Sequence, residues 1–276
     1  MRSTAGSPPD AGADGGRGAA FFDLDKTLME GSSAVHFGRA AYGAGLISRG
    51  QLARDLVANI RFRLKGSTDE SSAALRDRIL EALAGTRVVD LARLSPEVLR
   101  TLLPRVYPEM LRVAYDHQDA GRPAYVVTAA SHEVAEMLAR VLVLDAGIGT
   151  RSEIKDGVYT GRPGGPFNYR EGKAETIRGF AAEHGIDLAQ SYAYSDSESD
   201  LPMLRAVGHP VVVNPDTELA RIAREEGWQV IRFDKLARRL RIAAAAGGLA
   251  LVGVGGGYAA GELRERRRGP RLRLRR

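Results

Sequence analysis

The chain contains no cysteine among its 276 residues. This absence excludes disulfide bonds, thiolate metal sites and cysteine nucleophiles. It also fits a reducing compartment, so we expect a cytoplasmic protein. Residues 1–18 lack the apolar stretch of a secretory signal peptide and consist mainly of Gly, Ala, Ser, Pro and Asp. We expect them to form a disordered tail.

Most of the sequence also lacks a basic stripe. The formal net charge is +6, but residues 262–276 alone hold eight arginines and two glutamates, and four more basic residues lie at 235–241. Residues 1–234 are therefore mildly acidic, with a net charge of −4. A specific nucleic-acid-binding domain carries a basic face. We therefore expect no specific nucleic-acid partner.

The C-terminal tail, residues 234–276, contains an uncharged stretch at 242–261 that is bordered by arginines. Its length is just enough to span a bilayer, and the arginines suit anionic lipid headgroups. Its richness in Gly and Ala also fits a flexible or loosely helical tail. Association with the inner face of a membrane and a free tail both stay open.

The most informative stretch is residues 19–31, Ala-Ala-Phe-Phe-Asp-Leu-Asp-Lys-Thr-Leu-Met-Glu-Gly. Its apolar start predicts a short buried strand with Asp23 at the carboxyl end. Open α/β sheets bind their ligands at that end. Asp23 and Asp25 repel each other unless a cation or a shared proton relieves them. Taken alone, the pattern also fits an Asp-rich turn.

Residues 33–120 show helical periodicity and no convincing strand. Leu52, Leu56 and Ile60 are spaced by four and mark the buried face of one helix. Gly-Ser-Thr-Asp at 66–69 combines helix stop and start signals. We expect helices near 33–44, 49–65, 69–83, 95–103 and 107–120.

From Pro123 onward, predicted strands and helices alternate. Residues 147–162 predict a β-hairpin with Asp156-Gly157 as its turn. The alternation indicates a mostly parallel sheet that is covered on both faces. The expected strands are 124–127, 191–195, 210–213 and 229–233, and the expected helices begin at 131 or cover 171–184, 198–206 and 216–226.

The predicted architecture is an α/β fold, namely a doubly wound parallel-sheet core with an inserted all-α cap. We assign residues 19–32 and 121–233 to the core and residues 33–120 to the cap. The length of 276 residues is enough to bury such a core.

Four short segments place polar groups where a strand ends or a helix begins. They are Asp23-x-Asp25, Thr128, Lys173 and the acidic turn at 196–200. Each has an ordinary explanation alone: Thr128 could cap a helix, Lys173 could be a surface lysine, and the turn could cap the next helix. Their joint occurrence on a doubly wound pattern favours a shared site.

These segments resemble the motifs of the haloacid dehalogenase superfamily of phosphohydrolases. The likeness is to the subgroup with a helical cap after the first strand, which includes phosphoserine phosphatases, and in particular to its bacterial subfamily IB hydrolases. It is carried by Phe-Asp-Leu-Asp-Lys-Thr-Leu at 22–28, Val-Val-Thr-Ala at 126–129, Gly-Lys-Ala at 172–174 and Tyr-Ser-Asp-Ser-Glu-Ser-Asp-Leu-Pro-Met-Leu at 194–204.

The resemblance implies a phosphomonoester hydrolase that works through an aspartyl-phosphate. Asp23 would attack phosphorus, and Asp25 would protonate the leaving alkoxide and then deprotonate the attacking water. Mg²⁺ would bind the Asp23 carboxylate, the Asp25 backbone carbonyl and Asp196. P-type ATPases and dehalogenases lack the second Asp of this pattern, so Asp25 favours a phosphatase, with a phosphomutase as the alternative.

The other motif residues would hold the phosphoryl group. The Thr128 hydroxyl and the Ala129 N–H would donate to phosphoryl oxygens, and Lys173 would neutralise their charge. Asp200 would hold either Lys173 or a metal-bound water.

Substrate specificity is expected to come from the cap. In phosphoserine phosphatases a Glu shortly after the first motif and an Arg in the cap hold the amino acid. Glu30 is a candidate for the first role, and Arg61 or Arg63 for the second. Glu30 lies two positions closer to the first motif than the Glu of phosphoserine phosphatases does. In the last motif, Ser199 occupies the position before the final Asp, where an Asn is often found. We expect a small organic phosphate as substrate, either phosphoserine-like or lipid-related.

Two other functions stay open at this stage. A phosphotransferase that uses an acceptor other than water would need the same residues. A non-catalytic sensor of phosphoryl ligands at the membrane is a rival of another class, although a binding module would not need Asp25. The sequence gives no indication of an oligomeric state.

Overall fold

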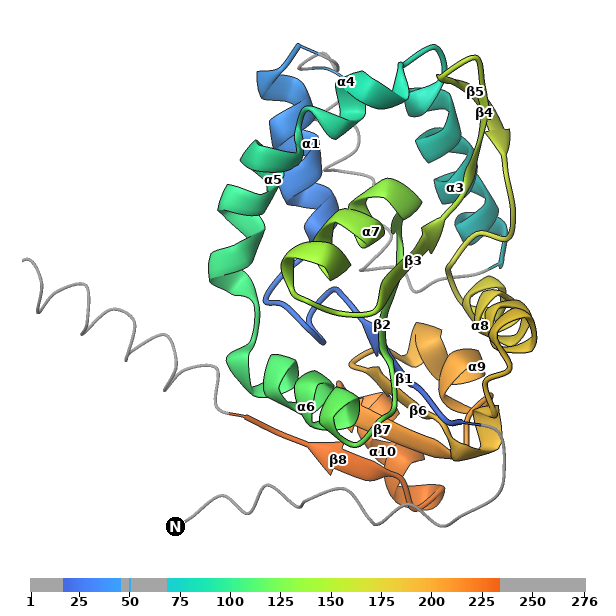
Figure 1. Ribbon diagram of the computed structural model, residues 1–276. Coiled ribbons are helices and arrows are strands. Elements are labelled where there is room, and N and C mark those ends of the chain that lie inside the picture. The colour runs from blue at the N-terminus through green and yellow to red at the C-terminus, as the bar shows by residue number, and fades with distance from the viewer. Residues whose placement is uncertain (1–16, 46–49, 51–68, 234–276) are drawn as a thin grey trace, which may run out of the picture. The chain divides into compact units, whose positions relative to one another are not determined.

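The structure, a computed structural model, describes residues 17–45, 50 and 69–233 (Figure 1). The chain divides into two compact units, residues 1–231 and 232–276. All the helices and strands named below belong to the first unit.

Two predicted features lie outside the described residues. One is most of the helix expected at 49–65, and the other is the tail at 234–276 with its uncharged stretch at 242–261. Among the helices that the structure describes, none combines the length and the apolarity needed to cross a bilayer.

The described chain begins two residues before the expected start at Ala19. Arg17 forms an isolated parallel bridge with Ile186, and its guanidinium donates to the carbonyl of Gly121. These contacts tie Arg17 to the folded unit.

In the described residues, six parallel strands form the central sheet in the order β3-β2-β1-β6-β7-β8 (Figure 1). All four residues of β1 are buried, as expected for a central strand that is covered on both faces. The strands are β1 (Ala20–Asp23), β2 (Ala124–Ser131), β3 (Ala146–Thr150), β6 (Tyr192–Ser195), β7 (His209–Val213) and β8 (Gln229–Ile231).

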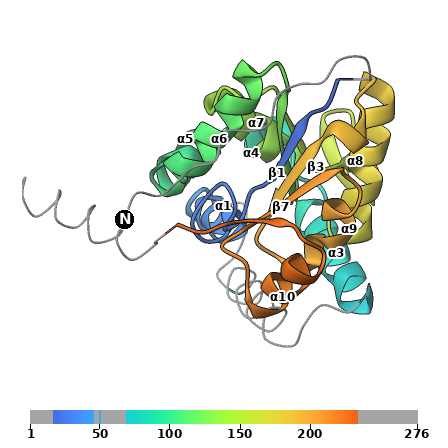
Figure 2. The same ribbon diagram turned by 90° about the horizontal axis from the view of Figure 1, so that it is seen from below.

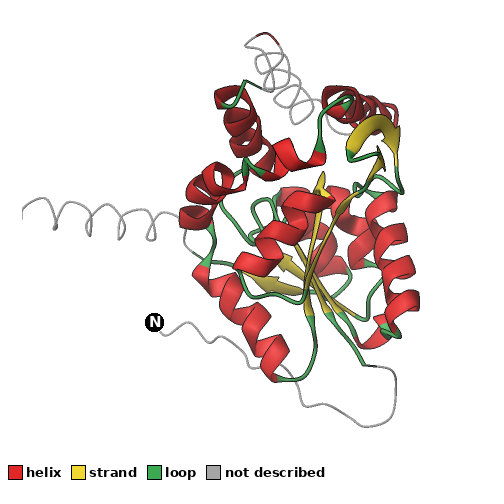
Figure 3. Ribbon diagram, turned by 45° about the horizontal axis from the view of Figure 1, so that its top comes forward, coloured by secondary structure: helices red, strands yellow, loops and turns green. Residues whose placement is uncertain are grey.

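Helices cover both faces of this sheet (Figure 3). Figure 2 shows α6 and α7 on one side and α8 and α9 on the other. The main apolar cluster joins Phe21 and Val127 from the strands to Ile177 of α8, Met203 of α9 and Leu219 of α10. The doubly wound parallel sheet is thus confirmed. These helices are α6 (Pro108–Asp119), α7 (His132–Val141), α8 (Glu171–His184), α9 (Leu201–Leu204) and α10 (Thr217–Glu225).

Between β1 and β2 the described chain is helical, which agrees with the prediction of an all-α insertion. Helices α1 and α5 pack against each other, and α5 runs on through the short 3₁₀ helix η1 towards α6 (Figure 1). The helix α4 was not predicted. The elements of this segment are α1 (Ser33–Gly43), α3 (Asp69–Leu83), α4 (Val88–Ala92), α5 (Ser95–Leu102) and η1 (Leu103–Arg105).

The predicted hairpin at 147–162 is partly wrong. Its first residues belong to β3, which pairs with β2 at the edge of the main sheet. Asp156 and Gly157 do form the turn, and both have positive φ angles, as the tightest hairpin turns require. The hairpin consists of β4 (Ser152–Lys155) and β5 (Val158–Pro163).

The hairpin is hydrogen-bonded to the segment that follows α3. The N–H of Gly85 donates to the carbonyl of Tyr159, and the N–H of Val88 donates to that of Gly157, both at 2.9 Å. The turn between α3 and α4 is therefore fixed to an element that lies far along the sequence.

Candidate active site

The predicted site residues converge at the carboxyl ends of β1, β2 and β6. Asp23 is the last residue of β1 and is in register with Val127, which directly precedes Thr128 on β2. Asp196 follows the last residue of β6. Because β1 lies between β2 and β6, three chain segments far apart in sequence meet at one edge.

Lys173 forms the centre of the site. It lies in the first turn of α8 with only 3% of its side chain exposed. Its Nζ donates to Oδ1 of Asp23 at 2.7 Å and to Oδ2 of Asp200 at 2.8 Å. The hydroxyl of Ser195 also donates to Oδ2 of Asp200, at 2.7 Å. The ammonium of Lys173 thus bridges two buried carboxylates.

The buried charges do not balance. Burial raises the pKa of Asp23 to about 8; Lys173 opposes this rise, and the charges of Asp200 and Asp196 add to it. Burial alone would lower the pKa of Lys173, but the charges of Asp200 and Asp23 outweigh it, and the pKa is raised. One buried ammonium therefore faces several carboxylates, and a further cation would relieve them.

The donor chemistry fits Mg²⁺. In the part of the chain that the structure describes, no three acidic, His or Cys side chains form a metal-binding group. Mg²⁺ does not need such a group, because it commonly takes one or two carboxylates and keeps its waters. Asp23 and Asp196 supply two carboxylates, and a cation facing Asp23 would lower its pKa and keep it ionised. The Nζ of the half-exposed Lys26 lies 3.6 Å from Oδ2 of Asp196 and forms an ion pair with it.

Asp25 lies where the β1 loop meets the helical insertion. Its Oδ1 accepts a hydrogen bond from the N–H of Ser33 at 2.8 Å. Ser33 is the first residue of α1, so the start of this helix orients the Asp25 carboxyl group. Asp25 is partly exposed, whereas Asp23 is buried. The two carboxylates therefore have different surroundings, which is what two different roles require.

Hydrogen bonds hold Thr128 and Ala129, which lie within β2 rather than after it as expected. The buried Oγ1 of Thr128 accepts the N–H of Ala130 at 3.2 Å. The Ala129 carbonyl accepts a hydrogen bond from the hydroxyl of Thr150 at 3.0 Å. That hydroxyl in turn accepts the N–H of the fully buried Asn168 at 3.2 Å. These hydrogen bonds hold the backbone of Ala129 in place and so fix the direction of its N–H.

Of the predicted specificity residues, the structure places one. Glu30 lines a cavity between α1 and η1, and its N–H donates to the carbonyl of Arg105 at 2.8 Å. Arg61 and Arg63 lie outside the described residues.

Sequence reasoning missed three residues of this network. Ser195 was visible as the polar residue that ends β6 beside the acidic turn, but a strand end is polar for many reasons. Thr150 and Asn168 gave no signal, because their contacts with Ala129 exist only once β3 lies beside β2.

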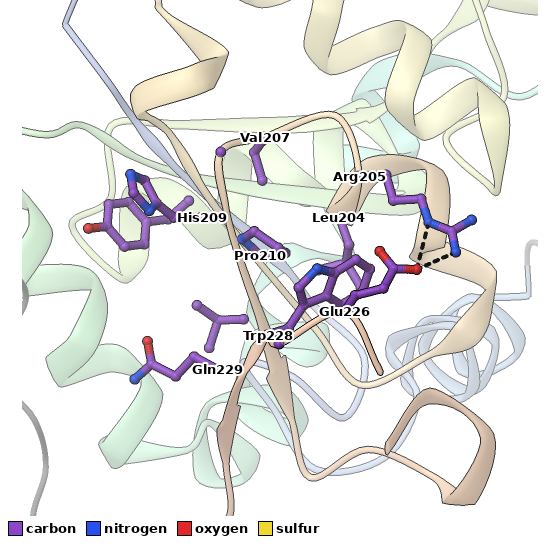
Figure 4. Close-up of a pocket in the computed structure, with 12 residues that line it drawn as sticks. Leu204, Arg205, Val207, His209, Pro210, Glu226, Trp228 and Gln229 are labelled. Carbon is purple, nitrogen blue, oxygen red and sulfur yellow. Dashed lines mark hydrogen bonds and ion pairs between the residues drawn. The ribbon is translucent and has the colours of Figure 1, made fainter. Parts of the chain in front are cut away.

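A separate cavity of about 490 Å³ lies at the other end of the sheet (Figure 4). It is lined by Tyr192 and His209, which begin β6 and β7, and by Trp228. The ion pair between Arg205 and Glu226 lies at its edge. None of the predicted site residues lines this cavity.

Comparisons with known proteins agree with this geometry. The sequence profile of the haloacid dehalogenase-like hydrolases matches residues 20–205. The chain is 37% identical to phosphoserine phosphatase SerB1 of Mycobacterium tuberculosis, over 88% of this chain and 79% of that protein. It is 30% identical to a histidinol-phosphatase of Neisseria meningitidis, over 78% of this chain and 98% of that protein.

A solved structure is also similar. A protein of unknown function from Bordetella pertussis is 33% identical and superposes with a TM-score of 0.69, covering 79% of this chain and 99% of its own. The family match includes β1, β2, the start of α8 and β6, which hold the residues gathered around Lys173. The chain therefore belongs to the haloacid dehalogenase-like hydrolase family.

Proposed function

We propose that the chain is a Mg²⁺-dependent hydrolase of phosphomonoesters that acts through an aspartyl-phosphate on Asp23. The observation that carries the proposal is the buried bridge from Lys173 to Asp23 and Asp200 at the carboxyl edge of the sheet. The bridge fixes the Asp23 carboxylate and leaves its charge only partly compensated. Such a carboxylate is suited to attack a phosphorus atom whose charge is neutralised at the same place.

The proposed reaction has two steps. An oxygen of Asp23 attacks phosphorus, the bond from phosphorus to the ester oxygen breaks, and the departing alkoxide takes a proton from Asp25. Water then attacks the phosphorus of the aspartyl-phosphate while Asp25 takes a proton from that water. The bond from phosphorus to the Asp23 oxygen breaks, which frees the Asp23 carboxylate and releases inorganic phosphate. The hydrogen bond from Ser33 to Asp25 holds the proton carrier in place for both steps.

The remaining residues stabilise the charge on the phosphoryl group. Lys173 contributes its ammonium, and the hydroxyl of Thr128 and the N–H of Ala129 would donate to phosphoryl oxygens. A bound Mg²⁺ would be held by Asp23, Asp196 and the carbonyl of Asp25, and it would supply electrostatic neutralisation of the phosphoryl oxygens.

The identity of the phosphate ester is a separate question. One similar protein is named for phosphoserine and another for histidinol phosphate. Their leaving groups differ in charge, because only phosphoserine carries a carboxylate. The substrate proposed from the sequence, a small phosphoserine-like or lipid-related ester, therefore needs a direct test.

The test is phosphate release from a panel of phosphomonoesters with and without Mg²⁺, with Asp23→Asn run in parallel. The panel contains phosphoserine, histidinol phosphate, glycerol phosphate and lysophosphatidic acid. We expect release that needs Mg²⁺ and is lost in Asp23→Asn while the variant stays folded. Unchanged turnover in Asp23→Asn would overturn the proposal, as would binding of these esters by a folded protein without turnover. Release of the alcohol without inorganic phosphate would overturn it in favour of transfer to another acceptor.

A further inference from the structure

Two lysine side chains contact the three carboxylates that gather at the carboxyl edge of the sheet. Lys173 contacts Asp23 and Asp200, as described above. Lys26 contacts Asp196, with 3.6 Å between its Nζ and Oδ2 of the carboxylate. This ion pair joins the loop after β1 to the residue that follows β6. Asp196 therefore has a cation of the chain itself beside it.

The two lysines are held very differently. The Lys173 side chain is 3% exposed, and its contacts of 2.7 and 2.8 Å have the length of charge-assisted hydrogen bonds. The Lys26 side chain is 46% exposed, and its contact with Asp196 is longer than such a hydrogen bond. A half-exposed pair separates at little cost because water replaces each partner, whereas separating a buried pair is costly. Lys26 can therefore leave Asp196, while Lys173 stays in place.

The backbone of Lys26 is fixed even though its side chain is half-exposed. The N–H groups of Leu28 and Met29 both donate to the carbonyl of Leu24, at 3.1 and 3.0 Å, and so close a tight loop around Lys26. The side chains of these three residues are buried. Lys26 itself has a φ of 61°, in the left-handed region that residues other than Gly rarely adopt. The flexible stem of Lys26 thus starts from a fixed point and reaches Asp196.

We propose that Lys26 and Mg²⁺ compete for Asp196, so that the ammonium of Lys26 weakens Mg²⁺ binding and is displaced when the metal binds. The inference rests on the proposed Mg²⁺ site and concerns the regulation of that site by the concentration of Mg²⁺. Its physical reason is charge, because an ammonium and a divalent cation repel each other and are attracted to the same carboxylate. Without the metal, Lys26 neutralises Asp196. With the metal, its stem turns towards solvent.

Calorimetric titration of Mg²⁺ into the full chain measures this competition without any turnover. Lys26→Gln keeps most of the length of the side chain and removes its charge. We expect it to bind Mg²⁺ roughly 3- to 10-fold more tightly than the wild type at low ionic strength, as for a half-exposed charge that faces a divalent ion. Lys26→Arg keeps the charge and should bind as weakly as the wild type. Lys155→Gln, a change at an exposed lysine of β4, is the matched control and should do the same.

Urea denaturation gives a second readout that also needs no turnover. Mg²⁺ that binds only the folded chain stabilises it by an amount that grows as the dissociation constant falls. At one fixed Mg²⁺ concentration, the denaturation midpoint should therefore rise more in Lys26→Gln than in the wild type or in Lys155→Gln. Without Mg²⁺, the midpoint of Lys26→Gln should not exceed that of the wild type, because the variant has lost a favourable ion pair. A higher midpoint in the absence of Mg²⁺ would contradict that pair.

The outcomes separate this inference from the proposed reaction. Equal Mg²⁺ affinities in the wild type and Lys26→Gln would overturn the inference, even if the chain proved to be a Mg²⁺-dependent phosphatase. An equal gain in Lys26→Arg or in Lys155→Gln would also overturn it, because the charge at Lys26 would not be the cause. If neither the wild type nor Lys26→Gln bound Mg²⁺, the inference and the proposed metal site would both fail. Tighter binding in Lys26→Gln alone would support the inference even if Asp23 were not the nucleophile.

Discussion

The Nζ of Lys173 lies 2.7 Å from the carboxylate of Asp23, although 150 residues separate them in the sequence. The same ammonium contacts Asp200 at 2.8 Å, and all three side chains are almost fully buried. Removing one member of such a group leaves the others as uncompensated buried charges. We therefore propose that Lys173 acts on both the stability of the fold and the chemistry of Asp23.

We expect Lys173→Met to lower the free energy of unfolding by about 3–5 kcal/mol, because two buried carboxylates lose their shared cation. The variant should also lose most of its phosphatase activity. Urea denaturation and phosphate release measure the two effects. Lys155→Met removes an exposed lysine of β4 and should change stability by less than about 0.5 kcal/mol. Similar stability losses in the two variants would contradict the bridging role.

Thr150 is predicted to act as a positioning residue through Ala129. Thr150→Val removes the hydroxyl between the Ala129 carbonyl and the Asn168 N–H, and should cost about 1–3 kcal/mol of stability. It should also lower kcat/KM, because the N–H of Ala129 loses its fixed direction. Thr150→Ser keeps the hydroxyl and should retain kcat/KM. If Thr150→Val and Thr150→Ser had the same kcat/KM, the hydrogen bond from Thr150 to Ala129 would have no role in catalysis.

His117 predicts a pH dependence of stability. It is buried, its Nδ1 accepts from Nε of Arg122 at 2.9 Å, and its Nε2 lies 2.7 Å from the Tyr194 hydroxyl. Burial, with a smaller effect of the Arg122 charge, lowers its pKa from 6.5 to about 4. As the pH falls below 6.5, the unfolded chain takes up the proton first. This group therefore stabilises the fold above that pH and loses its contribution between about pH 6.5 and pH 4.

His117→Gln isolates this effect, since Gln can accept from Arg122 and donate to Tyr194 but does not titrate in this range. Between neutral pH and about pH 4, wild-type stability should fall by roughly 3 kcal/mol more than that of the variant. Urea denaturation across this range measures the difference. The same pH dependence in both proteins would show that His117 does not titrate as described.

The sequence predicted those features that depend on local pattern. The bounds of α3 and α8 agree with the expected ranges 69–83 and 171–184, and α3 begins at the start signal of residues 66–69. Asp23 and Asp196 were expected where strands end, and they lie at the end of β1 and directly after β6. Thr128 was also expected at a strand end, but β2 continues to Ser131, past an irregularity in its pairing with β3. Short strands that alternate with helices leave few other arrangements.

Features that depend on packing were not predicted. Gly147 weakened the strand pattern of β3, yet the fold needs this glycine, because a Cβ there would lie 2.0 Å from the backbone carbon of Ala135. The expected helix at 198–206 is split, because Asp200 ends a 3₁₀ turn and points its carboxylate at Lys173. In the same way, Arg39 and Arg105 line one cavity only because α1 packs against α5.

The central claim is that Asp23 carries the phosphoryl group during turnover, and chemical trapping tests it most directly. The Asp25→Asn variant should form the aspartyl-phosphate slowly and hydrolyse it more slowly still, since it lacks the base for the attacking water; kcat should fall about 10²- to 10⁴-fold. Acid quenching during turnover, followed by peptide mass spectrometry, should find one added phosphoryl group on Asp23. Turnover with no phosphoryl group on Asp23 in either protein, or with the group on another residue, would contradict the account.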